Sequence, residues 1–155
     1  MASTISAATL TVKLTEAITL NGTAQGASNT KTFASINEIS KRIVTITTTE
    51  ATIATFSAAA GQGTYIAANV RYIRFTNKDD ANFIMLTFKD EDNTEVRIKL
   101  DAGQSFIYNG DNNGGLVDTM KANGSALASG LADLYDITAD ADTASCDLEM
   151  FIASV

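Results

Sequence analysis

The sequence predicts an all-β protein, an antiparallel β-sandwich of the jelly-roll type, with an immunoglobulin-like sandwich as the alternative. About seven to nine short stretches have strand-like composition, with turn signals roughly every 8 to 12 residues. No stretch has a convincing helical period. The 155 residues contain no proline and no tryptophan, which favours sheet throughout and a thin core between two packed sheets. A chain of this length predicts one domain, residues 1–155.

The first expected strand covers residues 9–14, where apolar residues occupy every second position. This alternation is typical of a half-buried strand. Asn21 and Gly22 then form a turn pair that tolerates positive φ. Residues 23–30 are mainly small and polar, so we expect an exposed loop there.

The next segment, residues 33–39, is ambiguous, because its isoleucines have helical spacing but its neighbours are rich in threonine and β-branched residues. We expect a loop that enters a strand. Residues 42–48 and 52–56 then predict a hairpin joined by residues 49–51. Residues 57–63 are small and flanked by glycine, which predicts a flexible connection.

The segment 70–108 predicts a meander of antiparallel strands. Residues 71–76 and 83–88 have strand composition and flank a polar turn at 77–82. Because residues 83–88 are apolar at nearly every position, we expect a central strand that is buried on both faces.

Residues 95–100 alternate strictly, with Val96, Ile98 and Leu100 expected to face inward. A turn follows, and residues 105–108 begin another strand.

The last part of the chain changes character. Residues 109–131 are rich in glycine and asparagine and predict a long loop excursion, of the kind that is functional or contacts neighbours. Residues 134–137 and 147–153 are expected to close the sheets and to hold the C-terminus in a strand. The single cysteine, Cys146, lies in an apparent strand, where we expect it to be a buried small hydrophobe. We expect no reactive thiol, since the chain has no histidine to activate it.

Composition excludes several classes of function. The net charge of -7 and the pI near 4.4 oppose binding to nucleic acid, which needs clustered lysine and arginine. Without histidine there is no Ser-His-Asp triad and no histidine-bound metal, and no phosphate-binding loop is present. We therefore expect no enzyme, and we assign no catalytic, cofactor-binding or metal-binding residues.

Acidic residues gather at 79–80, 90–92 and 140–142. Such carboxylates could bind calcium, or act as a glycosidase pair, but none matches a calcium loop and turns favour aspartate in any case. We expect plain turns and no cofactor. No apolar run approaches the roughly 18 residues that span a bilayer, and the start of the chain lacks a signal peptide, so we expect no membrane partner and a cytosolic origin.

Five phrases together resemble a family of small virion structural proteins of tailed bacteriophages, and the resemblance covers nearly the whole chain. The phrases lie at residues 10–22, 36–44, 70–83, 100–106 and 139–153. The chain departs from the family within residues 57–64 and 109–131, where the resemblance transfers least.

The resemblance implies a capsid decoration, or cement, protein: a sandwich domain on the outer face of the phage head that ties capsomers together. Such proteins are often homotrimers. The implied partners are the major capsid protein and further copies of the chain, and the implied location is the head surface of the virion, after synthesis in the host cytoplasm. The alternatives are a tail, neck or fibre component, or a carbohydrate-binding module on the virion surface.

Overall fold

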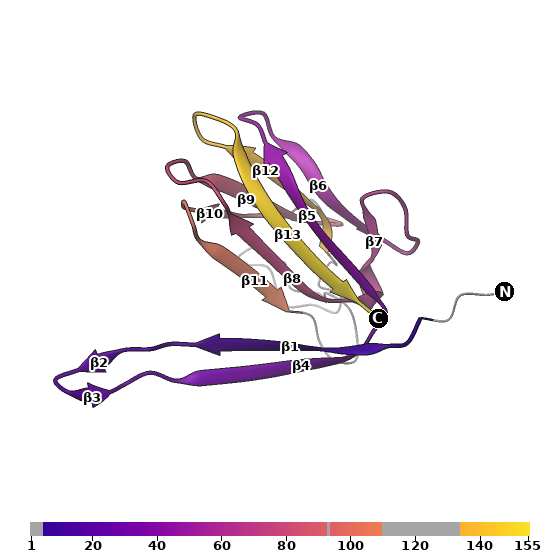
Figure 1. Cartoon of the computed structure of the whole chain (residues 1–155). Helices are drawn as coiled ribbons and strands as arrows, with labels where there is room; N and C mark the ends of the chain where they lie inside the picture. The colour runs from indigo at the N-terminus through magenta and orange to yellow at the C-terminus, as the bar shows by residue number, and fades with distance from the viewer. Residues whose placement is uncertain (1–4, 93, 110–133) are drawn as a thin grey trace.

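The computed structural model describes residues 5–92, 94–109 and 134–155. These residues form a β-sandwich body and a long two-stranded arm that runs beneath the body and extends beyond it (Figure 1). The C-terminus lies close to the place where the arm leaves the body (Figure 1).

The body consists of two sheets. Sheet I has four strands, in the order β11 (Ser105–Asn109), β8 (Val70–Asn77), β13 (Cys146–Ser154) and β5 (Glu38–Ile46). Sheet II has five strands, in the order β10 (Glu95–Leu100), β9 (Ile84–Asp90), β12 (Leu134–Ala141), β6 (Ala51–Ser57) and β7 (Thr64–Ile66). All neighbours are antiparallel except β6 and β7, and a short 3-10 helix, η1 (Ala67–Asn69), follows β7.

The strand order is that of a jelly roll. The first strand of the body, β5, pairs with the last, β13; β6 pairs with β12, β8 with β11, and β9 with β10. Folding this long nested hairpin over itself brings β8 beside β13 and β9 beside β12. The predicted antiparallel sandwich is confirmed. The immunoglobulin-like alternative does not fit, because that fold pairs its first two strands in one sheet, whereas β5 and β6 lie in opposite sheets.

Two predicted local pairings are wrong for the same reason. The expected hairpin of residues 42–48 and 52–56 is a crossover from β5 in sheet I to β6 in sheet II. The expected meander also changes layers, since β8 and β11 pair in sheet I while β9 and β10 form a hairpin in sheet II. Turn residues signal that the chain reverses, but the reversed strand can either pair with its predecessor or cross to the other sheet.

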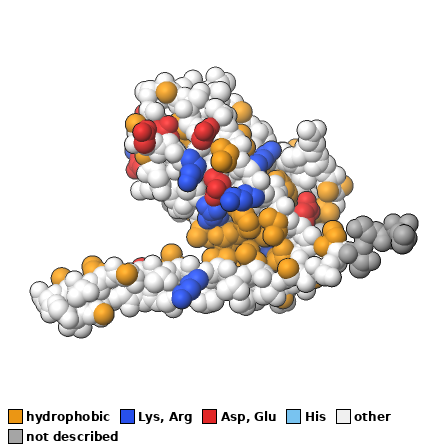
Figure 2. Space-filling model, viewed as in Figure 1, with side chains coloured by type: hydrophobic (Ala, Val, Ile, Leu, Met, Phe, Trp, Pro, Cys, Tyr) orange, Lys and Arg blue, Asp and Glu red, His pale blue; other side chains and the backbone are white. Residues whose placement is uncertain are grey.

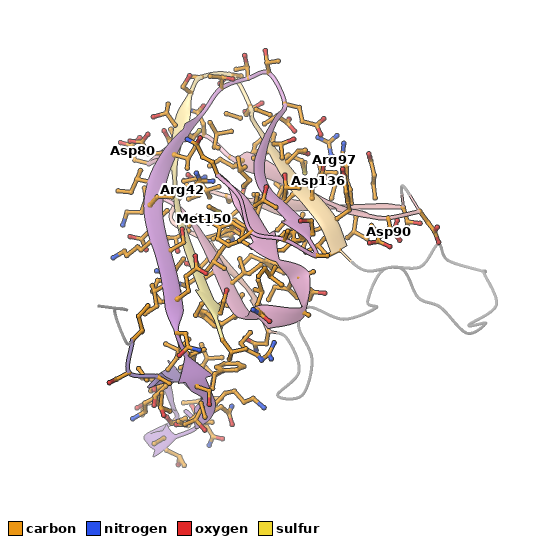
Figure 3. All side chains as sticks on the ribbon, turned by 90° about the vertical axis from the view of Figure 1, so that its right-hand side faces the viewer. Arg42, Asp80, Asp90, Arg97, Asp136 and Met150 are labelled. Carbon is orange, nitrogen blue, oxygen red and sulfur yellow. The ribbon has the colours of Figure 1, made fainter. Side chains whose placement is uncertain are left out.

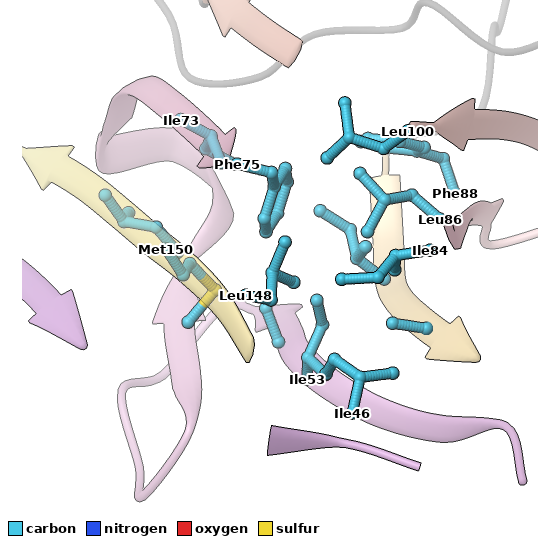
Figure 4. Close-up of a cluster of buried hydrophobic side chains, with 14 of the residues drawn as sticks. Ile46, Ile53, Ile73, Phe75, Ile84, Leu86, Phe88, Leu100, Leu148 and Met150 are labelled. Carbon is cyan, nitrogen blue, oxygen red and sulfur yellow. The ribbon is translucent and has the colours of Figure 1, made fainter. Parts of the chain in front are cut away.

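The core lies between the two sheets (Figure 4). From β9, Ile84, Leu86 and Phe88 point into it, and Leu86 is fully buried. The opposite face of β9 is mixed: Thr87 is 1% exposed, whereas Met85 is partly exposed. The prediction of a strand buried on both faces is therefore correct for the inner face and for only part of the outer face.

The neighbouring strand β10 departs further from expectation. Leu100 is buried and Ile98 packs against the core, but Val96 is 45% exposed. Because β10 is the edge strand of sheet II, Val96 has a neighbouring strand on one side only. By contrast, Cys146 is 1% exposed, as expected, and the C-terminus is held in β13, with the Val155 amide donating to the Asn69 carbonyl at 3.0 Å.

The arm contains four strands: β1 (Ala8–Thr15), β2 (Thr19–Leu20), β3 (Thr23–Ala24) and β4 (Ser28–Ile36). The residues expected as an exposed loop at 23–30 are all exposed, but only 25–27 lie outside strands, because β3 pairs with β2 and β4 pairs with β1. The segment 33–39 enters β5 as expected, but the loop expected before it shrinks to Asn37, because residues 33–36 belong to β4. The turn at Asn21 and Gly22 is confirmed, with φ of 50° and 78°. Apart from Asn109, which ends β11, the predicted excursion 109–131 lies outside the described residues.

Candidate interaction surface

The arm is attached to the body by a small apolar cluster, here called the arm-root cluster. Its buried members are Phe33, Ile36, Tyr72 and Ala153, and the partly buried Leu10, Val12, Phe151 and Val155 pack against them. This cluster lies on the outer face of sheet I and is separate from the core between the sheets. Tyr72 is its centre, with ring centroids 6.0 Å from Phe33 and 5.9 Å from Phe151.

A β-bulge in β4 explains how the arm binds there. The β1–β4 register shifts between the pairs Leu10–Phe33 and Ala8–Ile36, and Ser35 adopts a φ of 62°. An extra residue in one strand lets two side chains spaced by three positions face the same side. Phe33 and Ile36 are thus both buried against sheet I, at 2% and 3% exposure.

Beyond the root, the arm contacts little but itself. Every residue from 13 to 32 is exposed, including Leu14, Ile18 and Leu20 at 54%, 58% and 60%. We call the stretch 13–32 the distal arm. An isolated two-stranded ribbon is marginally stable in water, so the uncovered leucine and isoleucine side chains suit a surface that a neighbour covers.

The arm and the body leave an open hollow between them. Val12, Leu14 and Lys31 line it from the arm, and Ile107 and Asn109 line it from β11, around a volume of about 320 Å³. Figure 2 shows hydrophobic side chains on the body directly above the arm and others scattered along the arm. One side of the distal arm therefore faces its own body without filling the space.

A second uncovered apolar area lies at the free edge of sheet I. Ile39 and Ile43 project from the outer face of β5 and are 57% and 62% exposed. We call this pair the β5 strip. Since β5 has a neighbour only on its β13 side, it is a long edge strand of the kind that pairs or packs with other chains.

Ion pairs border the β5 strip. Glu149 on β13 lies opposite Ile43 and contacts Arg74 at 2.5 Å and Lys41 at 3.6 Å. The hydrogen bond from Arg74 is the main cause that holds the pKa of Glu149 below its usual value. This carboxylate is therefore ionised and committed to holding neighbouring strands together.

The outer face of sheet II carries a separate ion-pair network. Lys89 bridges Glu50 and Glu95 at 3.3 and 3.2 Å, and the hydroxyl of Thr138 donates to Glu50. That hydroxyl is the main cause of a lowered pKa for Glu50. Arg97, which pairs with Asp140 at 2.7 Å, lies on the same side of the body as Asp136 (Figure 3).

Asp136 is the least satisfied member of this face. One of its carboxylate oxygens is buried without a hydrogen-bond partner. Burial raises the pKa of Asp136, and this outweighs the opposing effect of Lys89. A single carboxyl of this kind offers no paired acid and base, so we assign it no chemistry.

The acidic turns hold their own loops. Asp79 accepts hydrogen bonds from the amides of Ala81 and Asn82 at 2.8 and 2.6 Å, which lowers its pKa. Asp90 accepts from the Thr94 amide at 2.6 Å. Within residues 5–92, 94–109 and 134–155, no three cysteine, aspartate or glutamate side chains gather in a metal-binding arrangement. Burial also raises the pKa of the Cys146 thiol.

Sequence reasoning did not find this surface. It assigned no site residues and placed contacts with neighbours in the excursion 109–131. A usable signal was present in residues 9–20, where alternation continues towards the Asn-Gly turn with apolar residues at Leu14, Ile18 and Leu20.

In the described part of the chain, no helix is long and apolar enough to cross a membrane. No family model, curated protein or solved structure matches this chain.

Proposed function

We propose that this protein is a structural component of a tailed-phage virion, a decoration or cement protein that binds the outer face of the major capsid protein shell and stabilises the head. The observation that carries the proposal is the distal arm: a projecting ribbon with three uncovered apolar side chains, Leu14, Ile18 and Leu20. Such an arm suits a protein whose function is to contact neighbours. The resemblance of five sequence phrases to phage virion proteins supports the same assignment.

The body suits a rigid spacer. Its core between the sheets has fully buried side chains from both layers, among them Phe75 and Leu148 of sheet I and Leu86 and Ile137 of sheet II. The outer faces are tied by ion pairs across strands. A body of this kind keeps its shape while the arm and the strand edges make contacts.

Repetition would make weak contacts sufficient. A shell presents the same binding surface many times, so modest contacts per subunit add up when subunits also touch one another. The net charge of -7 keeps free subunits apart by repulsion before they assemble in the host cytoplasm. The partners in this proposal are the major capsid protein and further copies of this chain, with three copies around one axis as in many decoration proteins.

We assign no catalytic residue and no cofactor. Carboxylates among the described residues have structural roles: Glu50 and Glu149 form ion pairs, and Asp79 accepts hydrogen bonds within its turn. The proposed activity is binding alone.

A capsid-binding assay tests the proposal. Purified protein is mixed with heads of the corresponding phage that lack it, the heads are pelleted, and bound copies per head are counted by quantitative gel analysis. We expect saturable binding at many copies per head and a higher temperature of head disruption. The triple variant Leu14→Ser, Ile18→Ser, Leu20→Ser should bind less.

Val96→Ser is the matched control, because Val96 is also an exposed apolar residue but lies on β10 of sheet II, away from the arm. It should bind as the wild type does. Binding to tails or necks and not to heads would replace the decoration assignment with that of a tail or neck component. Binding to neither, together with capture by a glycan surface, would favour a carbohydrate-binding module.

A further inference from the structure

We propose that the distal arm of one copy docks on the β5 strip of a second copy, so that the free protein associates by exchanging arms. The contact lies between copies of this chain and does not depend on where the protein sits in a virion.

The first argument is continuity with the arm-root cluster. The apolar row of β1 begins at Leu10 and Val12, which pack on the outer face of sheet I, and continues at Leu14, which is uncovered. Alternate residues of a strand share one face. Leu14 therefore shares the face of the arm that binds the outer face of sheet I, and it lines the open hollow beside Ile107 of β11 without being covered. The apolar face of the arm is matched to the surface of sheet I.

The second argument is that sheet I has a vacant place for it. Ile39 and Ile43 lie on the same outer face as the arm-root cluster, and Ile39 pairs with Ala153, a buried member of that cluster. The two isoleucines thus extend the cluster towards the free edge of sheet I, with Lys41, which pairs with Glu149, between them on the same face. It is more than half exposed at both residues.

The third argument identifies the occupant as a second copy. The arm leaves the body near the start of β5 and runs beneath the sandwich past β11, so its tip points away from its own β5 strip (Figure 1). β5 and β11 are the opposite edges of sheet I. One molecule therefore cannot cover its own strip with its own distal arm, whereas a neighbour can.

Charge is compatible with this contact and opposes other contacts between copies. Residues 1–37 contain Lys13 and Lys31 against Glu16, whereas residues 38–155 contain nine basic and seventeen acidic side chains. Two acidic bodies repel each other. The arm has a slight excess of positive charge and can approach an acidic body. Along β5 itself Glu38 is next to Ile39, and the two basic residues that follow are already engaged, Lys41 with Glu149 and Arg42 with the Ile53 carbonyl.

The two surfaces that meet in this contact, the distal arm and the β5 strip, are different parts of each copy. Such a heterologous contact closes into a ring when the rotation between copies allows it, or into a reciprocal dimer when two copies exchange arms. In either case each copy uses its arm and its strip once.

A complementation experiment tests the proposal with the full chain. One variant loses the arm surface (Leu14→Ser, Ile18→Ser, Leu20→Ser), and the other loses the strip (Ile39→Ser, Ile43→Ser). All five side chains are exposed, so both variants should fold, which melting temperature and circular dichroism check. Sedimentation velocity over about 1 to 500 μM then measures association, a range that covers micromolar affinity.

We expect the wild type and the Val96→Ser control to associate, and each variant alone to weaken association by at least about tenfold in Kd. An equimolar mixture of the two variants should form a 1:1 complex, because each supplies the surface that the other lacks. A monomeric wild type throughout the range, wild-type association of either variant, or a mixture that stays monomeric would each overturn the proposal. Capsid binding without association in solution would leave the proposed function standing and reject only the arm exchange.

Discussion

Phe33→Ala should release the arm from the body while the sandwich stays folded. Phe33 is 2% exposed and contacts Tyr72 at the centre of the arm-root cluster, which is separate from the core between the sheets. Truncating a buried phenylalanine to alanine costs about 3 to 5 kcal/mol. Because the lost contacts join arm to body, this cost should fall mainly on the docking of the arm.

The magnitude predicts a large local change. A loss of about 3 kcal/mol raises the population of the undocked arm more than a hundredfold, since about 1.4 kcal/mol corresponds to a factor of ten. The tightly packed strands of the body should keep most of their protection, because local opening and global unfolding are separate events.

Native-state hydrogen exchange with mass spectrometry measures both the local opening of the arm and the unfolding of the body. Peptides covering residues 8–15 and 28–36 should exchange more than a hundredfold faster in Phe33→Ala, while peptides covering β9 change far less. Ser35→Ala is not a suitable control because of its positive φ, but Thr32→Ala is, since Thr32 is exposed and adjacent. Unchanged arm exchange would show that Phe33 is no anchor. Equal acceleration in β9 would show that arm and body form one cooperative unit.

Three further predictions concern the body. Leu86→Ala, in the core between the sheets, should lower the free energy of unfolding by about 2 to 5 kcal/mol in denaturant melts, and a loss below about 1 kcal/mol would place β9 outside the core. Asp136→Asn should raise stability at pH 7 by about 1 kcal/mol. Because the pKa of Asp136 is raised in the folded protein, ionisation of this side chain lowers stability as pH rises above 3.8, its ordinary pKa. The gain in stability of Asp136→Asn over the wild type should therefore vanish below pH 3.8. An equal gain at all pH values would contradict burial as the cause. Glu149→Gln should cost about 0.5 to 1 kcal/mol at pH 7, and because its pKa is lowered by Arg74, the deficit should shrink as pH falls below 4.5; a pH-independent deficit would point to packing instead.

Local pattern predicts the strands of this protein better than their partners. The alternation in residues 95–100 and the apolar run in 83–88 identify β10 and β9, and their hairpin is the pairing that proximity in sequence predicts. The pairing of β5 with β13 joins residues about a hundred positions apart. Nothing in the residues near Ile43 specifies that partner, because it depends on how all the intervening strands nest.

The arm was missed for a related reason. Alternation in residues 9–14 indicates a strand with one apolar face, and such a face packs either on the molecule's own core or on another chain. Leu10 and Leu14 follow the same alternation, yet Leu10 is partly buried on sheet I and Leu14 is 54% exposed. Leu10 packs against the arm-root cluster, whereas Leu14 lines the open hollow beside Ile107, and this difference is a property of the assembled fold.

The most direct test of the proposed function is a reconstruction by electron cryomicroscopy of the phage virion to which the proposal assigns this chain. We predict a jelly-roll body repeated over the outer face of the head, with the distal arm of each copy against the β5 strip of a neighbour or against the capsid protein. A head without this density, or density confined to the tail or neck, would contradict the proposal.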